Sequence, residues 1–232
     1  MDNYDLDFSK LTTNDLYEIA DKFKLPIKTA TKSHLISLIS SRYYQLSKYM
    51  KYSYIKQLGF KGLDGRTFLI KDDKNNEYAI KIFKDTKDPK AIETEAKLQI
   101  RASEFNIAPR VIEYSCHGKF LVMERMSITL YHLFRKQNDS LTDAQQKSII
   151  SLFRRLDKAK VFHGDPNPLN FMRKNGKWFA IDYGFARPID DSCVKRYGHT
   201  PNMTYMPLGL YLKFKEVCPG VKLSYIKKFS SE

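Results

Sequence analysis

Two short segments of the chain carry side chains that could do chemistry together. The first runs from His163 to Asn170 and reads His-Gly-Asp-Pro-Asn-Pro-Leu-Asn; the second reads Asp182-Tyr183-Gly184. Carboxylate and amide oxygens are the ligands that Mg²⁺ prefers, and a carboxylate can also orient a hydroxyl group. A turn rich in Asp, Pro and Asn needs no chemical role, so the first segment alone would equally fit a structural loop.

The spacing of these residues resembles the catalytic loop of protein kinases, H-R-D-x-x-x-x-N, followed by the metal motif D-F-G. His163, Asp165 and Asn170 match the loop and Asp182 begins the second motif, with Gly164 where most kinases have Arg. The resemblance implies that Asp165 is the catalytic base and that Asn170 and Asp182 hold Mg²⁺. Phosphoryl transfer fits this set, because it demands positioned metal ions and an oriented nucleophile rather than covalent catalysis.

A further part of the kinase pattern lies upstream. The segment Tyr78-Ala79-Ile80-Lys81 resembles the kinase V-A-I-K strand, in which alternation puts Ala79 and Lys81 on one face. The resemblance places Ala79 beneath adenine and Lys81 at the phosphates of ATP. On the helix expected next, Glu95 is placed to pair with Lys81, and Glu93 is an alternative partner.

Glycines and an apolar segment complete the implied nucleotide site. Gly59, Gly62 and Gly65 resemble a phosphate-covering loop, because glycines let backbone N–H groups approach phosphate oxygens. The first two glycines are one residue further apart than in G-x-G-x-x-G, and a plain hairpin turn is the alternative. Residues 121–126 resemble the strand that leads into the adenine-binding hinge, with Met123 as gatekeeper. The implied ATP-binding residues are Gly59, Gly62, Gly65, Ala79, Lys81, Glu124 and Met126.

The hydrophobic pattern predicts the elements that position these residues. Residues 67–70 and 78–83 are expected to form two strands of a hairpin, residues 89–104 a helix and residues 120–123 a buried strand. Thr142 with Gln145 forms a capping-box pattern, which predicts a helix that ends near residue 159. This order indicates an α+β fold, and with the resemblance it implies a two-lobed kinase-like fold.

Only 48 residues follow Gly184. We therefore expect an N-lobe with its hinge at residues 49–126 and a reduced C-lobe at residues 127–232. This reduction, the His-Gly-Asp sequence and Pro109-Arg110-Val111 resemble the compact atypical kinases, such as the RIO group and the small kinase of the KEOPS complex. Kinase-like chains of such size occur in large DNA viruses. Residues 200–207 resemble the end of an activation segment without the Glu of its A-P-E element.

The resemblance implies an ATP-dependent protein kinase with Mg²⁺ as cofactor and a protein substrate. Family likeness favours Ser/Thr acceptors, although Asn167 stands where Ser/Thr kinases usually place a Lys. Two alternatives remain. The pattern H-G-D-x-x-x-x-N also occurs in aminoglycoside and choline phosphotransferases, but these usually need a larger C-terminal helical region. A nucleotide-binding scaffold without turnover is disfavoured, because Lys81, Asp165, Asn170 and Asp182 are all present.

The composition of the chain indicates which classes of partner and which cellular compartment to expect. Forty Lys and Arg against 26 Asp and Glu give a formal charge of +14, which favours polyanionic partners or simply a well-solvated surface. Three widely spaced cysteines indicate neither a disulfide framework nor a zinc site. No signal-peptide pattern or membrane-length apolar stretch occurs. We expect an intracellular protein that binds no membrane, in the cytoplasm or nucleus, and an activating protein partner is compatible with the short C-lobe.

The first 48 residues differ from the rest. Leu16, Ile19 and Ala20 recur at helical spacing, and a second helix is expected from Leu35 to Ile39. Residues 11–41 resemble a SAP-like helix-loop-helix motif, a type that often binds DNA, and a bland bracing element is the alternative. If the motif binds nucleic acid, the phosphate contacts are expected from Lys22, Lys24, Lys28 and Lys32.

Overall fold

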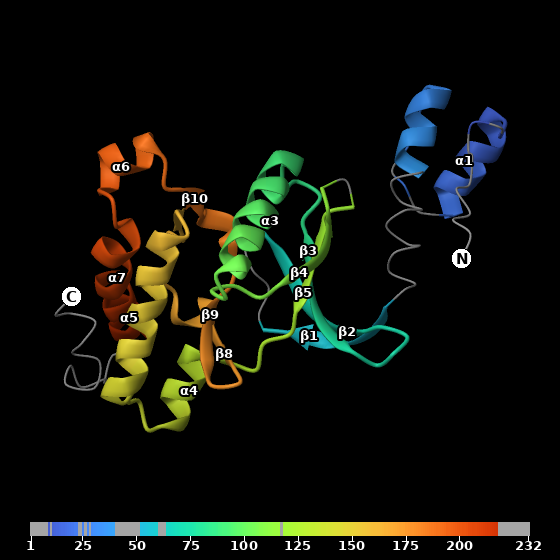
Figure 1. Cartoon of the computed structure of the whole chain (residues 1–232). Coiled ribbons are helices and arrows are strands. Elements are labelled where there is room, and N and C mark those ends of the chain that lie inside the picture. The colour runs from blue at the N-terminus through green and yellow to red at the C-terminus, as the bar shows by residue number, and fades with distance from the viewer. Residues whose placement is uncertain are drawn as a thin grey trace. The chain divides into compact units, whose positions relative to one another are not determined.

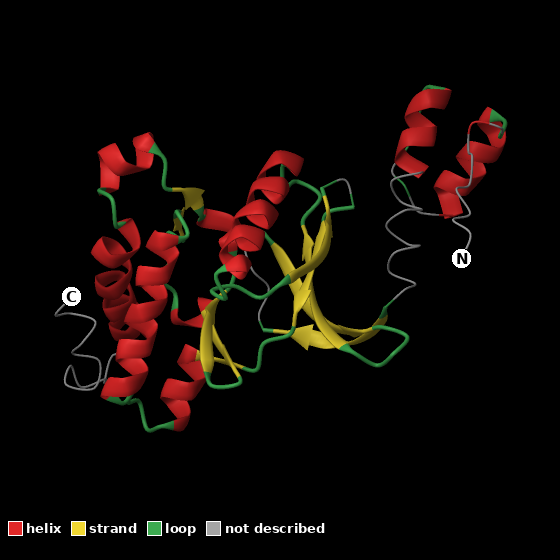
Figure 2. Cartoon of the chain, viewed as in Figure 1, coloured by secondary structure: helices red, strands yellow, loops and turns green. Residues whose placement is uncertain are grey.

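A computed structural model of the protein describes residues 9, 11–22, 25, 27, 29–39, 52–59, 64–116 and 118–217. The chain divides into two compact units, and the smaller one contains the helices near the N-terminus. Helices and strands are mixed along the larger unit (Figure 2), so the α+β class expected from the sequence is confirmed.

A five-stranded sheet carries Lys81. Its strands are β1 (Ser53–Leu58), β2 (Gly65–Lys71), β3 (Glu77–Phe83), β4 (Val111–Ser115) and β5 (Phe120–Glu124), in the spatial order β1-β2-β3-β5-β4. β3 and β5 are antiparallel and pair Lys81 with Leu121 and Ala79 with Met123. Lys81 therefore projects from a central strand, where hydrogen bonds to both neighbours hold the backbone in place.

Helix α3 (Pro89–Glu104) packs beside this sheet (Figure 1). Asp88 caps its N-terminus by accepting a hydrogen bond from the Lys90 N–H at 3.1 Å, and Pro89 suits the first helical position. Ile92 and Ala96 are fully buried and pack in one core with side chains of β3 and β5. Their i and i+4 spacing fixes the face of α3 that points to the sheet.

The remaining helices are α4 (Leu130–Lys136), α5 (Asp143–Lys158), α6 (Asp191–Tyr197) and α7 (Pro201–Val217). α5 begins with the predicted capping box of Thr142 and Gln145, in which each residue's side chain bonds the other's backbone N–H. α5 and α7 run side by side (Figure 1) and share a buried core that includes Phe153 and Phe214. This core supports the chain segments between the two helices.

Those segments form short strands and turns. β6 (Ile128–Thr129), β8 (Phe171–Lys174) and β9 (Lys177–Ala180) make a three-stranded sheet, and β7 (Val161–Phe162) pairs with β10 (Arg187–Pro188). The 3₁₀ turns η2 (Pro168–Asn170) and η3 (Tyr183–Phe185) lie beside these strands in the chain. The residues of the two motifs, His163–Asn170 and Asp182–Gly184, thus lie in turns between short strands, next to the core of α5 and α7.

Residues 200–207, which resemble the end of an activation segment, belong mainly to helix α7 in the structure. Met206, Leu210 and Phe214 recur every fourth residue and are at most 1% exposed, so their burial stabilises a helix across this region. Pro207 lies inside the helix, where it lacks a backbone N–H to donate. The likeness to the end of an activation segment is therefore limited to the sequence.

The N-terminal unit contains α1 (Thr13–Lys22) and a helix over residues 32–39. Leu16 and Ala20 pack against Leu35 and Ile39, and all four are at most 2% exposed. The hydroxyl of Tyr17 accepts a hydrogen bond from the Ala30 N–H at 2.8 Å. Of the lysines expected to contact nucleic acid, Lys24 and Lys28 lie outside the described residues. Within the part of the chain that is described, no helix has the length and apolar character needed to cross a membrane.

Candidate active site

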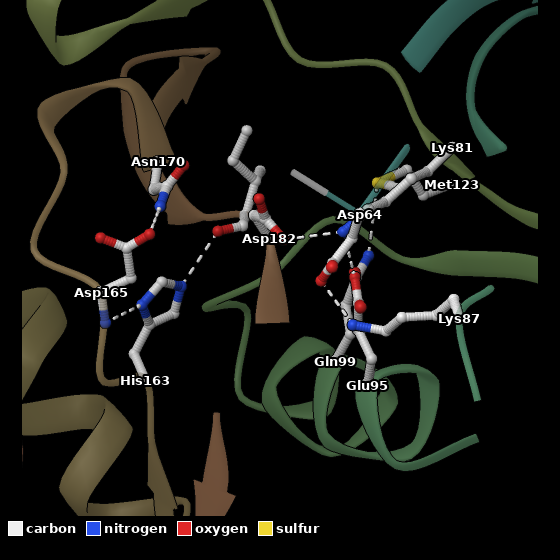
Figure 3. Close-up of polar contacts among 11 residues, drawn as sticks. Asp64, Lys81, Lys87, Glu95, Gln99, Met123, His163, Asp165, Asn170 and Asp182 are labelled. Carbon is white, nitrogen blue, oxygen red and sulfur yellow. Dashed lines mark hydrogen bonds and ion pairs between the residues drawn. The ribbon is translucent and has the colours of Figure 1, made fainter. Parts of the chain in front are cut away.

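Lys81 and Glu95 form a buried ion pair between the sheet and α3. The Lys81 Nζ lies 2.5 Å from Glu95 Oε1, and the side chains are 10% and 2% exposed (Figure 3). The other candidate, Glu93, instead pairs with Lys97 one turn further along α3, on the partly exposed side of the helix. Of the two acidic residues considered from the sequence, the structure thus brings only Glu95 to Lys81.

Asp182 joins this pair from the second motif. Its Oδ1 accepts a hydrogen bond from Lys81 Nζ at 2.7 Å (Figure 3). The backbone of Asp182 is left-handed, with φ of 62°, a conformation that Asp tolerates better than most residues. Uncommon backbone conformations of this kind cluster at functional sites. The Lys81 ammonium group therefore lies between two carboxylates that come from different parts of the fold.

Burial and charge set the protonation of these three groups. Burial lowers the pKa of Lys81, but the charges of Glu95 and Asp182 outweigh it, so the pKa of Lys81 is raised and the ammonium group stays charged. Burial raises the pKa of Asp182, but the Lys81 charge and hydrogen bond outweigh it and leave the pKa lowered. Burial raises the pKa of Glu95, which Lys81 only partly offsets, and Glu95 Oε2 has no hydrogen-bond partner among the described residues.

His163 is fully buried and joins the two motifs. Its Nε2 donates to the carbonyl of Ile181 at 3.0 Å, and its Nδ1 accepts from the Asp165 N–H at 3.4 Å (Figure 3). Burial lowers the pKa of His163, so the ring is neutral with its proton on Nε2. The ring of Tyr183 packs edge-on against it, with the centroids 5.1 Å apart.

Asp165 is oriented by two hydrogen bonds from its own loop. The Asn170 side-chain amide donates to Asp165 Oδ2 at 2.8 Å, and the Asn167 N–H donates to Oδ1 at 3.1 Å. The backbone N–H of Ile181 donates to the Asn170 carbonyl at 2.8 Å, which fixes Asn170 beside the residue that precedes Asp182. The loop thus presents one oriented carboxylate and leaves the Asn170 side-chain oxygen as a ligand for a cation.

The structure explains Gly164. Its φ of +77° is unfavourable for a residue with a side chain, and a Cβ atom there would lie 3.0 Å from the Phe185 carbonyl oxygen. An Arg at this position would be strained by the backbone conformation and crowded by Phe185. The departure from the usual kinase sequence therefore follows from the path of this loop.

Sequence reasoning missed a buried polar network beneath the loop. Asp157, at the end of α5, accepts hydrogen bonds from the backbone and side-chain N–H groups of Asn202 at 2.9 and 2.7 Å. The Asn202 side-chain oxygen accepts from the His163 N–H at 3.0 Å, and its amide also donates to the Val161 carbonyl. Asn202 is 0% exposed and Asp157 6% exposed. The network ties α5 and α7 to the segment that leads into the His163–Asn170 loop, through contacts that have no regular sequence spacing.

The glycines upstream have different surroundings. Gly62 lies outside the described residues. Gly59 has φ of +67° and open space around it, whereas a Cβ atom on Gly65 would lie 2.2 Å from the Ile82 carbonyl oxygen. Gly65 is therefore required by the close approach of β2 to β3, whatever its relation to a nucleotide. Between Gly62 and Gly65, Asp64 forms an ion pair with Lys87 near Gly184 (Figure 3).

The end of β5 carries the remaining candidates. The Glu124 N–H donates to the Arg110 carbonyl at 2.9 Å, so this group is not free for adenine, and the Glu124 side chain pairs with Lys174. Met126 is buried. Behind them the Gln99 side chain on α3 donates to the Pro109 carbonyl at 3.1 Å. Pro109-Arg110-Val111 thus connects α3 to the strand end through backbone carbonyls.

A divalent cation at this site would need phosphate or water ligands in addition to those that the protein supplies. Within the described residues no three His, Cys, Asp or Glu side chains gather to hold a metal by themselves. Mg²⁺ is commonly bound by one or two carboxylates together with substrate phosphates and waters. Asp182 and the Asn170 side-chain oxygen supply protein ligands of the right chemical type, and Lys81 supplies a cation for phosphate oxygens.

Comparison with known protein families gives a match over the middle of the chain. Residues 89–203 match the ABC1 atypical kinase-like domain. The matched region contains Glu95, Asp165, Asn170 and Asp182, whereas Lys81 lies before it. No curated protein matches the chain.

The match supports an atypical kinase-like protein, with ATP and a divalent metal as the ligands such domains generally use. It supports kinase activity in general, in a family that also includes atypical and pseudokinase members. The likeness to the RIO and KEOPS groups stays a prediction from the sequence.

Proposed function

We propose that the chain is an ATP-dependent protein kinase that transfers the γ-phosphoryl group to a Ser or Thr hydroxyl. The observation that carries the proposal is the position of Lys81, whose ammonium group lies 2.5 Å from Glu95 and 2.7 Å from Asp182. A scaffold has no need for a buried Lys–Glu pair that meets a third, partly exposed carboxylate at one point, since buried charges are costly to desolvate. A site that positions phosphates does need them.

In the proposed reaction the acceptor oxygen forms a bond to the γ-phosphorus while the bond from that phosphorus to the β–γ bridging oxygen of ATP breaks. The hydroxyl proton passes to Asp165, whose carboxylate is oriented by Asn167 and Asn170. Lys81 binds the phosphates and holds the nucleotide in place. A divalent cation such as Mg²⁺, held by Asn170 and Asp182, would neutralise charge on the phosphates.

We further infer a two-lobed arrangement. The sheet with α3, within residues 49–126, forms the nucleotide lobe, and residues 127–232 form a small helical lobe that carries Asp165. Adenine then lies near Ala79 and Met123, which pair between β3 and β5, and uses backbone groups of Glu124 and Met126 other than the occupied Glu124 N–H.

The N-terminal unit, within residues 1–48, is proposed as a SAP-like nucleic-acid-binding module of an intracellular protein. The helical pair has a small apolar core of its own, and Lys32 is exposed on it. Binding that rests on phosphate contacts weakens steeply with salt. The full chain is therefore expected to shift DNA in gels at low salt, and a chain with Lys32→Gln and Lys28→Gln to shift it less. Absence of any shift would remove this part of the proposal.

The experiment that tests the kinase proposal is incubation of the full chain with Mg²⁺ and γ-labelled ATP beside acceptors of two classes. One set contains acidic and basic proteins, and the other contains an aminoglycoside and choline. Label on protein alone supports the proposal. Label on the small molecules would show the rival phosphotransferase, and ATP binding without transfer to any acceptor would indicate a pseudokinase.

A further inference from the structure

A pocket adjoins the catalytic loop between β7, β10, α6 and α7. It encloses about 350 Å³, and Gly164 and Pro166 form part of its wall. These two residues flank Asp165 in the chain. A group held in the pocket therefore lies next to the proposed base.

The walls of the pocket are aromatic. Phe162, Phe185, Tyr197 and Tyr205 all contribute to the lining. The centroids of Phe162 and Tyr197 are 5.2 Å apart, and those of Tyr197 and Tyr205 are 5.3 Å apart with the rings nearly perpendicular. Phe185 is 59% exposed and Tyr205 45% exposed. An apolar hollow with exposed rings at its rim suits an apolar side chain of a ligand.

Two guanidinium groups lie over Tyr197, one of the rings that line this pocket. The Cζ atom of Arg187 lies 5.6 Å from the Tyr197 centroid and 5.9 Å from that of Phe162, and Cζ of Arg196 lies 5.1 Å from Tyr197. Both residues are exposed, and within the described part of the chain neither forms an ion pair with a carboxylate. A guanidinium fork matches the two oxygens of a carboxylate. Two cations beside one ring, without a carboxylate partner among the described residues, favour an anionic group between or beside them.

Arg187 lines the pocket, whereas position 164 could not supply a cation to it. A side chain at Gly164 would be strained and would meet the Phe185 carbonyl. Arg187 follows Phe185 by two residues, and β10 pairs it with Phe162, the residue before His163. The strand pairing thus holds a guanidinium close to the catalytic loop.

We propose that this pocket selects the acceptor and that Arg187 is its specificity-determining residue. The occupant is a protein segment with an apolar side chain next to the phosphorylated hydroxyl and a carboxylate side chain within a few residues. The inference rests on the proposed kinase function. The excess of basic residues, with a formal charge of +14, further favours an acidic segment.

The test uses the full chain and two fluorescent Ser peptides that share a Leu beside the Ser. One peptide carries two Glu residues after the Leu, and the other carries Gln at the same places. Affinity is measured by fluorescence anisotropy for the wild type, Arg187→Gln, Arg187→Lys and Lys195→Gln. Lys195 is an exposed residue of α6 that does not line the pocket, so Lys195→Gln removes the same charge and serves as the control.

The expected result is that the wild type binds the Glu peptide about tenfold more tightly, which corresponds to about 1.4 kcal/mol. Arg187→Gln loses this preference, Arg187→Lys keeps part of it and Lys195→Gln keeps it in full. Equal affinity of the wild type for both peptides would overturn the inference, and so would an equal loss in Lys195→Gln. Transfer of label to the same peptides is measured separately, so a failure of the kinase proposal shows as binding without transfer.

Discussion

The Nζ atom of Lys81 lies 2.7 Å from Oδ1 of Asp182, although 101 positions separate these residues in the chain. Lys81 comes from a central strand of the sheet and Asp182 from the segment that follows β9. Glu95 holds the same ammonium group from α3. The Lys81 ammonium group is therefore the common partner of two carboxylates. Its contribution to stability can be measured on the protein without nucleotide.

Lys81→Met is expected to lower the free energy of unfolding by about 3 kcal/mol, because it leaves the Glu95 carboxylate buried without a partner. The double variant Lys81→Met/Glu95→Leu should recover much of that loss, since no buried charge remains. Chemical denaturation without nucleotide measures both. A double variant as unstable as Lys81→Met would mean that the buried pair does not control stability here.

The buried, neutral His163 should make the fold sensitive to mild acid. Its pKa is lowered in the folded protein, so the unfolded chain binds a proton that the folded chain does not as pH falls below about 6.5. Stability is then lost on acidification at up to about 1.4 kcal/mol per pH unit until the folded pKa is reached. His163→Gln, which can still donate toward the Ile181 carbonyl, should be less stable at pH 7 but have a flatter dependence between pH 5 and 6.5. An unchanged slope in urea denaturation would contradict this assignment.

Gly65 and Gly59 are expected to be needed for different reasons, close packing of strands at Gly65 and backbone conformation at Gly59. A Cβ atom on Gly65 meets the Ile82 carbonyl at 2.2 Å, so Gly65→Ala must push β2 away from β3 and should cost about 2 kcal/mol or more. Gly59→Ala meets only the strain of a positive φ, about 1 kcal/mol. Thermal unfolding compares them. Equal losses would show that the close approach at Gly65 is not needed for stability.

The sequence was sufficient to predict the helices and strands that have regular apolar spacing or a capping motif. Lys81 lies in a mostly buried, apolar strand, and α3 and α5 show regular apolar spacing with caps. The bounds of these elements were predicted within a few residues. The mixed α+β class follows from the order of these elements, and the kinase-like resemblance rests on the motif residues that they carry. The roles given to Asp165, Asn170 and Asp182 remain proposals, although hydrogen bonds of Asn170 to Asp165 and to the Ile181 N–H bring these residues together.

The features that the sequence did not predict depend on contacts between residues far apart in the chain. The bonds between Asp157 and Asn202 span 45 positions, and nothing in the residues around Asn202 marks it as a partner of the catalytic loop. Gly65 fits a glycine-loop pattern, but the reason that a side chain is excluded there lies on the neighbouring strand. The pocket beside Arg187 is lined by residues of β7, η3, β10, α6 and α7 and of the loop after His163, so it has no local signature.

Asn202→Asp tests the buried network with an isosteric change. Asp157 already has a pKa raised by burial, and a second carboxylate beside it cannot be ionised at low cost. At pH 7 the variant is expected to be less stable than the wild type by about 2 kcal/mol, with the difference shrinking as pH falls and one carboxyl takes up a proton. Unfolding curves at pH 5 and pH 7 measure the difference. A constant or growing deficit at low pH would contradict the placement of Asp157 against Asn202.

The most direct test of the central claim is single-turnover transfer of label from γ-labelled ATP to a protein acceptor by the wild type and by Asp165→Asn. Asp190→Asn, a change of the same type at the exposed cap of α6, is the matched control. The account predicts that Asp165→Asn still binds ATP but transfers at least about a hundredfold more slowly, within the usual size of an acid–base contribution. Asp190→Asn should transfer at the wild-type rate. Equal transfer by Asp165→Asn and the wild type would contradict the account.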